Sequence, residues 1–268
     1  DGENGLNTGL ADLTLNGPVN ILSGGILSTG GTISFEAGAG ETSFANGMSG
    51  MLMKDSTLDL QTDLSVSWLE LSGESASFSS NGNTLKISNG LDIGGVELDF
   101  TDITTDNETY LNLVSDASLT KTGGLTLRQI DLKGYTLTLN QNITSLTANN
   151  IYFPDFNDSS PNYMLNTGKF KAEGVAVILR KMMYLNTGTM VMGGGKLTLE
   201  KGGFLQENAE LDLTDSTLEL AGPFYNYQAA GTLTTSASTL RLKSNVKFEP
   251  GNNATFETYE PNGWGMVL

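Results

Sequence analysis

Aromatic and acidic side chains gather in one short stretch of this chain. Four aromatic residues and two aspartates lie between Tyr152 and Tyr163. Those that we take as candidate ligand-binding residues are Tyr152, Phe153, Asp155, Phe156 and Tyr163. Aromatic faces stack on the apolar faces of sugar rings, and carboxylates accept hydrogen bonds from hydroxyl groups. The stretch therefore predicts either a carbohydrate-binding platform or a loop whose rings fold back onto the protein.

Aromatic residues elsewhere in the chain offer two further candidate sites. Tyr225 and Tyr227 belong to a second cluster, which we interpret as another loop. Trp68 alternates in phase with Leu64 and Val66 but out of phase with Leu69 and Leu71. Because successive residues of a strand point to opposite faces, one of those sets faces outward unless the strand bends. Trp68 is accordingly either an exposed ligand-binding residue or part of the core.

Acidic residues crowd one segment between residues 99 and 108. Calcium favours six to eight oxygen ligands, which makes Asp99, Asp102 and Asp106 the candidate metal ligands. Their spacing matches neither an EF-hand loop nor the glycine-rich nonapeptide repeat of calcium-binding solenoids. The alternative is a solvated acidic turn without a cofactor, and this reading agrees better with the spacing.

The residue types that most often carry catalysis are scarce. The chain contains no cysteine and no histidine, which excludes thiolate chemistry and a Ser/His/Asp triad. Two carboxylates close together would suit glycoside hydrolysis. The repeat described in the next paragraph brings Asp59, Lys86 and Asn112 to equivalent positions on successive turns, and these residues do not form a pair of acids. The sequence favours a binding protein over an enzyme and indicates no catalytic residue.

The elements that must position these residues show up as a repeated phrase. A Thr-Leu-polar-Leu pattern, with small variations, recurs at Thr57–Leu60, Thr84–Ile87, Thr136–Leu139, Thr217–Leu220 and Thr239–Leu242. Looser triplets fill the intervals, among them Leu111–Leu113 midway between Leu85 and Leu137, so the pattern predicts one turn from Leu58 to Leu85 and the next from Leu85 to Leu111. The turns marked out in this way are roughly 20–27 residues long, within the range of solenoid repeats. Such a period, carried by apolar-polar-apolar triplets, is typical of a β-solenoid in which each turn buries its apolar face on its neighbours. The middle residue of each triplet is expected to face water.

One step is longer than the rest. It runs from Leu137 to Val175, and the surplus lies near residues 149–165, where the aromatic stretch is. Extra residues in a solenoid turn leave it as a loop, and loops often carry binding sites. No change of composition marks a linker, so we expect a single domain over residues 1–268 with a loop insertion near 149–165.

With this period and alternation, the chain resembles the right-handed parallel β-helix superfamily. That superfamily includes pectin lyases, phage tailspikes, autotransporter passengers and β-helical carbohydrate-binding modules. The resemblance implies an all-β, right-handed parallel β-helix of about ten rungs. It implies a fold and not a chemistry, since one fold serves many functions.

Charge and chain ends restrict the partners. A net charge of −16 repels phosphate backbones and anionic lipid, and no run of 18 apolar residues exists. We therefore expect no nucleic-acid partner and no membrane insertion. The first residue is Asp1 rather than methionine, which suggests a piece of a larger bacterial protein, secreted or on the cell surface, with flanking domains.

Three functions fit these observations. The first is a non-catalytic module that binds a neutral plant-type polysaccharide such as xylan through its aromatic loops. The second is a structural or adhesive passenger segment of a bacterial surface protein, in which the same aromatic residues are buried. The third is a polysaccharide lyase or glycoside hydrolase. The sequence favours the first of these functions.

Overall fold

The structure is a computed structural model. It describes residues 6–16, 20–21, 26–36, 43–44, 50–105, 108–140, 142–152, 168–185, 188–206, 208–226, 231–251 and 254–267. These residues form strands, turns and bends, with no helix among them. The described part of the chain accordingly offers no helix with the length and hydropathy needed to cross a membrane.

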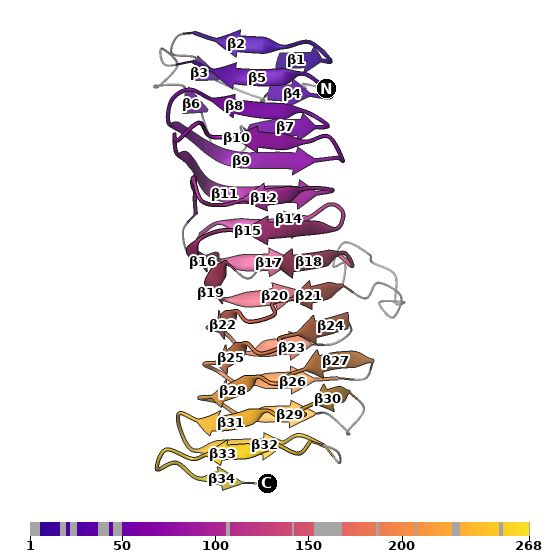
Figure 1. The fold of residues 1–268 in the computed structure, drawn as a ribbon, viewed down its shortest axis with the longest axis vertical. Coiled ribbons are helices and arrows are strands. Elements are labelled where there is room, and N and C mark those ends of the chain that lie inside the picture. Colours follow the sequence, from indigo (N-terminus) through magenta and orange to yellow (C-terminus); the bar gives the residue numbers. More distant parts are fainter. Residues whose placement is uncertain are drawn as a thin grey trace. The chain divides into compact units, whose positions relative to one another are not determined.

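The chain divides into two compact units, Asp1–Thr120 and Lys121–Leu268, and each is described by itself. In both units the strands run parallel and stack rung upon rung, as Figure 1 shows, with about 10 turns counted over both. The predicted all-β parallel β-helix fold is confirmed.

In the first unit most strands belong to two parallel sheets. One sheet has the order β1-β4-β7-β9-β11-β14, with β13 also on β11, and the other has the order β10-β8-β5-β2. In addition β12 pairs with β15, and β3 pairs with β6. The strands are β1 (Leu6–Gly9), β2 (Leu13–Leu15), β3 (Asn20–Ile21), β4 (Ile26–Ser28), β5 (Thr32–Phe35), β6 (Ser43–Phe44), β7 (Gly50–Lys54), β8 (Thr57–Leu60), β9 (Leu64–Ser72), β10 (Ser77–Ser79), β11 (Leu85–Gly94), β12 (Glu97–Asp99), β13 (Ile103–Thr104), β14 (Tyr110–Leu113) and β15 (Ala117–Thr120).

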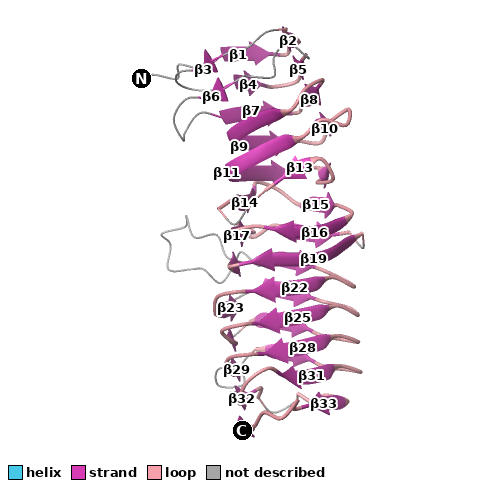
Figure 2. Ribbon diagram, turned by 90° about the vertical axis from the view of Figure 1, so that its left-hand side faces the viewer, coloured by secondary structure: helices cyan, strands magenta, loops and turns pink. Residues whose placement is uncertain are grey.

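In the second unit each regular turn contributes one strand to each of three sheets. Their orders are β18-β21-β24-β27-β30, β16-β19-β22-β25-β28-β31-β33 and β23-β26-β29-β32-β34, and β17 pairs with β20. The strands are β16 (Gly123–Thr126), β17 (Gln129–Asp131), β18 (Thr136–Leu139), β19 (Ile143–Ala148), β20 (Asn150–Tyr152), β21 (Lys169–Lys171), β22 (Ala176–Leu179), β23 (Met183–Leu185), β24 (Gly188–Val191), β25 (Lys196–Leu199), β26 (Gly203–Leu205), β27 (Ala209–Asp212), β28 (Thr217–Leu220), β29 (Phe224–Asn226), β30 (Thr232–Thr234), β31 (Thr239–Leu242), β32 (Val246–Glu249), β33 (Thr258–Glu260) and β34 (Met266–Val267). Figure 2 shows β22, β25, β28 and β31 lying side by side.

Alternation along the strands builds the core of each unit. In β31, Leu240 and Leu242 are buried while Arg241 between them lies on the outer face. Leu197, Leu218 and Leu240 are partners in register on successive rungs, so each turn places a leucine on the leucine of the turn below. The Thr-Leu-polar-Leu phrase thus encodes one strand of a rung, because its two apolar residues fill the interior.

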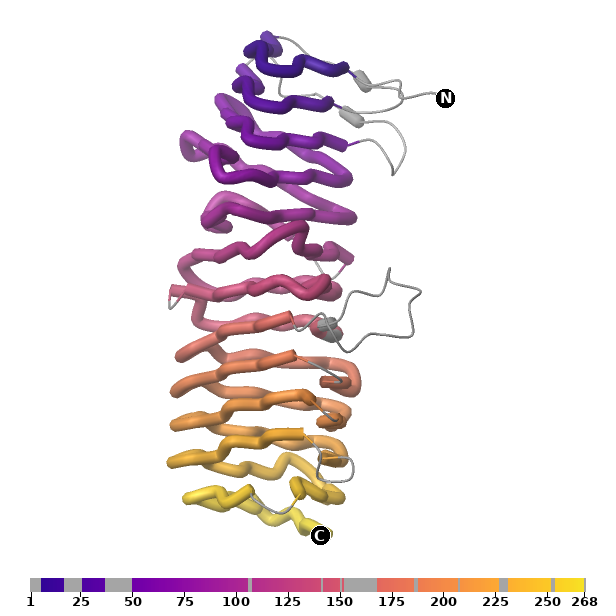
Figure 3. Tube along the Cα trace, turned by 90° about the vertical axis from the view of Figure 1, so that its right-hand side faces the viewer, coloured from indigo at the N-terminus to yellow at the C-terminus, as the bar shows by residue number. Residues whose placement is uncertain are grey.

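Tight corners separate the strands, and Figure 3 shows them as bends repeated from turn to turn. Between two of the sheets of the second unit, four successive corners carry a residue with positive φ: Gly174, Gly194, Asp215 and Ala237, at +73°, +74°, +57° and +52°. Glycine adopts this conformation without strain, whereas an L residue with a Cβ does so at a cost of about 1–2 kcal/mol. The corner shape is therefore kept even where glycine is absent.

Strand register corrects the predicted period in the first unit. Leu58 pairs with Ile33 on one side and with Phe78 on the other, and not with Leu85. Leu111 pairs with Leu91, and again not with Leu85. The longest of the regular steps expected from the sequence, from Leu58 to Leu85 and on to Leu111, are therefore wrong. They arise because the Thr-Leu-polar-Leu phrase occurs in strands of different sheets.

The long turn is where the sequence places it. Leu146 pairs with Val177 across this turn, whereas the following turn, from Val177 to its partner Leu197, is much shorter. The surplus lies between β20 and β21, and residues 153–167 are outside the described part of the chain. The predicted loop insertion near 149–165 itself stays a prediction, and the residues that suggested it, Leu137 and Val175, lie on different faces of the rung.

Candidate functional site

Trp68 lies where strand β9 changes its phase. Leu64 and Val66 at the start of β9 and Leu69 and Leu71 at its end are all buried. Ser67 and Trp68, two consecutive residues that are not buried, separate the two apolar sets, so β9 bends there. The register with β11 shifts at the same place, with the extra residue in β11 between Ile87 and Gly90. The bend brings both sets inward and leaves Trp68 on the outer face, half-buried. Of the two alternatives that the sequence allows for Trp68, the structure shows the outward one.

Two glycines make room for the Trp68 indole. Gly50 and Gly90 are its in-register partners on the rungs above and below. A Cβ built on Gly50 would lie 2.7 Å from Cε3 of Trp68, and one built on Gly90 would lie 2.8 Å from its Cδ1. The indole therefore reaches over one neighbouring rung with its benzo edge and over the other with its pyrrole edge. The indole is centred on its own rung, in a slot that a side chain at position 50 or 90 would fill.

The same outward row continues to a second aromatic residue. Gly90 pairs with Tyr110 on the next rung, and Tyr110 is half-buried on the outer face of β14 because Leu111 and Leu113 point inward. Trp68 and Tyr110 are thus separated by a single glycine rung. Since parallel strands lie about 4.8 Å apart, their backbone positions are about 9.6 Å apart.

A polar row runs beside the aromatic one. Glu70, Asp92 and Asn112 are in-register partners on the same three rungs, and all three are half-buried on the outer face. Asn112 Nδ2 donates to Asp92 Oδ1 at 2.6 Å, and Ser72 Oγ donates to Glu70 Oε1 at 2.8 Å. These contacts orient both carboxylates. The second carboxylate oxygen of Glu70 and that of Asp92 take no part in these two contacts and can accept a hydrogen bond from a ligand.

We call this surface the Trp68 face and define it as Trp68, Glu70, Asp92, Tyr110 and Asn112. It combines two aromatic rings with two carboxylates and one amide, all within the first unit. Rings offer stacking surface, while carboxylate and amide groups hydrogen-bond to hydroxyls. The arrangement suits a flat ligand that is rich in hydroxyl groups.

The slot in which Trp68 lies gives a direct test of this geometry. Replacing Gly90 by alanine forces the indole to move, and we expect the free energy of unfolding to fall by about 1–2 kcal/mol. In a Trp68→Ala background the same change meets no indole, and it is expected to be neutral or stabilising by a few tenths of a kcal/mol. Urea unfolding of the four proteins of this cycle measures the difference. Equal costs in both backgrounds would show that the indole does not cover Gly90.

Most of the other predicted ligand-binding residues lie outside the described part of the chain. These are Phe153, Asp155, Phe156, Tyr163 and Tyr227, and for Tyr152 only the backbone, the last residue of β20, is described. Their proposed role stays a prediction.

Tyr225 is described, and it does not lie in a loop. Phe224, Tyr225 and Asn226 form strand β29, with Phe224 fully buried and Tyr225 on the outer face. Tyr184, Phe204 and Tyr225 stack as a ladder on successive rungs, with ring centroids 5.4 and 4.9 Å apart. Lys247 Nζ lies 5.4 Å from the Tyr225 ring. Because neighbouring rings and a lysine cover their faces, Phe204 and Tyr225 present edges rather than flat faces to a ligand.

The acidic candidates for calcium are engaged with neighbouring groups. Asp99 Oδ1 accepts hydrogen bonds from the backbone N–H and the hydroxyl of Thr101, at 2.8 and 2.6 Å. Asp102 accepts a short hydrogen bond from Ser80 Oγ. Asp106 lies outside the described residues. Within the described ranges no group of three or more acidic side chains is placed to hold a metal ion.

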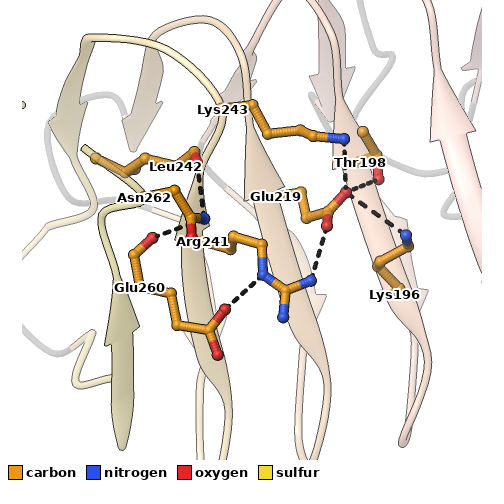
Figure 4. Close-up of polar contacts among 8 residues, drawn as sticks. All are labelled: Lys196, Thr198, Glu219, Arg241, Leu242, Lys243, Glu260 and Asn262. Carbon is orange, nitrogen blue, oxygen red and sulfur yellow. Dashed lines mark hydrogen bonds and ion pairs between the residues drawn. The ribbon is translucent and has the colours of Figure 1, made fainter. Parts of the chain in front are cut away.

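The second unit carries a charged cluster that the sequence did not indicate. Glu219, on the outer face of β28, is only 3% exposed. Figure 4 shows the residues around it: Arg241 donates to Oε1 at 2.9 Å, Thr198 donates to Oε2 at 2.9 Å, and the Nζ atoms of Lys196 and Lys243 lie 3.6 and 3.5 Å away. Burial raises the pKa of Glu219, but the two hydrogen bonds and the two lysine charges outweigh it and lower the pKa below its usual value. Because both carboxylate oxygens have partners on neighbouring rungs, this cluster is an ion-pair network that ties rungs together.

Sequence reasoning missed four of the five residues of the Trp68 face. Its search for an acidic row used Asp59 and Lys86, but Asp59 pairs with Ser34 and Ser79 in another sheet. Glu70 and Asp92 become neighbours only when Leu69 is aligned with Leu91. A search that allowed this shorter step would have found the alignment.

In comparisons with protein-family models, with curated proteins and with solved structures, nothing matches this chain.

Proposed function

We propose that this chain is a non-catalytic module that binds extracellular polysaccharide, and that it does so on the Trp68 face. The observation that carries the proposal is the pairing of two parallel rows. Trp68 and Tyr110 lie in one row with Gly90 between them, and Glu70, Asp92 and Asn112 lie in the next. A polysaccharide presents apolar ring faces and hydroxyl groups in alternation, and these two rows supply partners for both.

Charge narrows the class of polysaccharide. Neither row contains a lysine or an arginine, and the chain as a whole carries a net charge of −16. Glu70 and Asp92 repel a uronic-acid polymer at close range, while they accept hydrogen bonds from uncharged sugars. We therefore propose a neutral plant-type glycan, with xylan among the first to be tested, and a secreted or cell-surface location for the larger polypeptide that would carry this module.

A structural or adhesive segment is the second candidate, and the aromatic ladder of the second unit favours it. The two contacts of Tyr184, Phe204 and Tyr225 are ring against ring, which stabilises the stack of rungs and leaves the faces of Phe204 covered. A module whose role is only to extend a rod needs no more than this.

The experiment that tests the proposal is affinity electrophoresis in gels containing soluble xylan, β-glucan, mannan or pectin. We expect retardation by at least one neutral glycan, and a loss of about tenfold or more in affinity in Trp68→Ala, as for the anchor residue of an interface. Trp264→Ala is the matched control, because Trp264 is the only other tryptophan and is 46% exposed. It is expected to bind like the parent protein.

Circular dichroism and urea unfolding confirm that the variants are folded, and Asp92→Asn provides a milder change at the same surface. Retardation that survives in Trp68→Ala would place the binding elsewhere on the chain. A folded parent protein that no glycan retards would overturn the proposal and favour the structural segment.

A further inference from the structure

The two rows of the Trp68 face constrain how a polysaccharide can lie on it, provided that the proposed function holds. Rows of in-register residues run along the stacking direction of the strands, across the strands themselves. A ligand that contacts both Trp68 and Tyr110 must follow that direction. The polar row runs parallel to the aromatic row on the same three rungs. A polysaccharide that follows the aromatic row therefore keeps its hydroxyl groups against Glu70, Asp92 and Asn112 along its length.

The spacing of the aromatic row sets the repeat of the ligand. Trp68 and Tyr110 are two rungs apart, about 9.6 Å. This is close to the length of two sugar units in an extended β-1,4-linked chain with twofold symmetry, in which every second ring presents the same face to the same side. In a polysaccharide with threefold symmetry, such as xylan, every second ring does not present the same face to the same side, so its rings do not match the spacing of Trp68 and Tyr110.

We infer that the Trp68 face binds a neutral, twofold β-1,4-linked glycan of the glucan or mannan type, lying along the stacking direction with alternate sugars on Trp68 and Tyr110. The intervening sugar lies at the Gly90 rung, beside Asp92. The charge of the site agrees with a neutral ligand, since the two carboxylates accept hydrogen bonds from sugar hydroxyls and repel an anionic polysaccharide.

Titration of the Trp264→Phe variant with oligosaccharides tests this register. In this variant Trp68 is the only tryptophan, so its fluorescence reports directly on the proposed site. Cello- and manno-oligosaccharides of two to six units are the ligands. A trisaccharide is the shortest that spans both rings, and we expect its affinity to exceed that of the disaccharide by about tenfold, with smaller gains for longer chains.

Two further arms make the result specific. Tyr110→Ala is expected to remove the gain in affinity between disaccharide and trisaccharide. Xylo-oligosaccharides are expected to gain affinity gradually, without that step, and oligogalacturonates are expected not to bind. Tyr184→Ala, a change at an exposed tyrosine of the second unit, is the control and should leave the step intact.

The outcomes separate this inference from the proposed function. If a glycan is retained through Trp68 but the step is absent, or persists in Tyr110→Ala, the register is overturned and the polysaccharide-binding function stands. If xylo-oligosaccharides show the same step as cello-oligosaccharides, the twofold requirement is wrong. If no oligosaccharide changes the Trp68 signal and no polymer is retained, both proposals fail.

Discussion

Replacing Glu219 by alanine is expected to lower the free energy of unfolding by about 2–3 kcal/mol. The carboxylate lies within 3.6 Å of three cationic groups, on Lys196, Arg241 and Lys243. Its removal leaves these positive charges on neighbouring positions of one sheet without their shared counter-charge. Breaking a buried ion pair in this way costs about 3–5 kcal/mol, and the value here is smaller because the three cationic side chains remain 35–51% exposed to water.

The same cluster makes stability depend on pH in a defined direction. The pKa of Glu219 is lowered in the folded protein, so the folded state binds its proton less readily than the unfolded chain does. The stabilisation is therefore fully present above the ordinary glutamate pKa of about 4.5, and it is lost as the pH falls below that value through the lowered pKa. Urea midpoints between pH 7 and pH 3 measure this loss, which Glu219→Ala should reduce.

Glu210 provides a matched control on the same rung. It lies on the outer face of β27, accepts a hydrogen bond from Thr189 at 3.2 Å and is exposed. Thr189 and Glu210 repeat the pairing of Thr198 with Glu219 without the cations around it. Glu210→Ala is expected to change the free energy of unfolding by less than about 0.5 kcal/mol. Equal effects at the two positions would contradict a special role for the cation cluster.

The fold was predictable from the sequence because the core of a solenoid appears there as alternating apolar and polar residues that repeat from turn to turn. Leu197, Leu218 and Leu240 recur at nearly equal steps along the chain, and each is the register partner of the next. The period alone does not say which face a triplet occupies, however. Leu58 and Leu85 carry the same phrase but lie in different sheets, since a three-sided turn uses similar strands on each side.

The candidate site was only partly predictable for the same reason. The broken alternation around Trp68 marks the bend of β9, which the sequence shows on its own. Its partners Tyr110 and Asp92 depend on a register in which successive turns differ in length, since the step from Leu69 to Leu91 is longer than the step from Leu91 to Leu111. A one-residue error in register moves every side chain to the other face, so an outward row cannot be assembled from an average period.

The burial of an outward-pointing side chain is a second property that the alternation of apolar and polar residues does not predict. Glu219 occupies the middle of its triplet, where a residue in water is expected, yet it is almost fully buried. The long side chains of Lys196, Arg241 and Lys243 cover it from neighbouring rungs. Because these contacts join residues a full turn apart in the sequence, they follow only from the register.

Asn226 shows the opposite exception, a polar residue in an apolar row, and we expect Asn226→Leu to lower the free energy of unfolding by about 2–3 kcal/mol. Its register partner is Leu205, which in turn pairs with Leu185, and both leucines are fully buried. By alternation alone, leucine would be the better residue. The Asn226 side chain, 8% exposed, instead donates to the carbonyls of Gly231 and Pro250 and accepts from the Gly231 N–H, at 2.9, 3.0 and 3.0 Å.

Leucine fills the same space but leaves those three backbone groups without their partner, and each unsatisfied group costs about 1–3 kcal/mol when water cannot reach it. Gly231 and Pro250 are half-buried, so each of the three groups costs about 1 kcal/mol or slightly less, which gives about 2–3 kcal/mol for the three together. Urea unfolding measures the loss, and amide hydrogen exchange at Gly231 should become faster in the variant. Asn89→Leu, a change at an exposed position, is the control and should cost less than about 0.5 kcal/mol. If Asn226→Leu stabilised the protein instead, the apolar contacts of the row would outweigh the hydrogen bonds that Asn226 makes to Gly231 and Pro250.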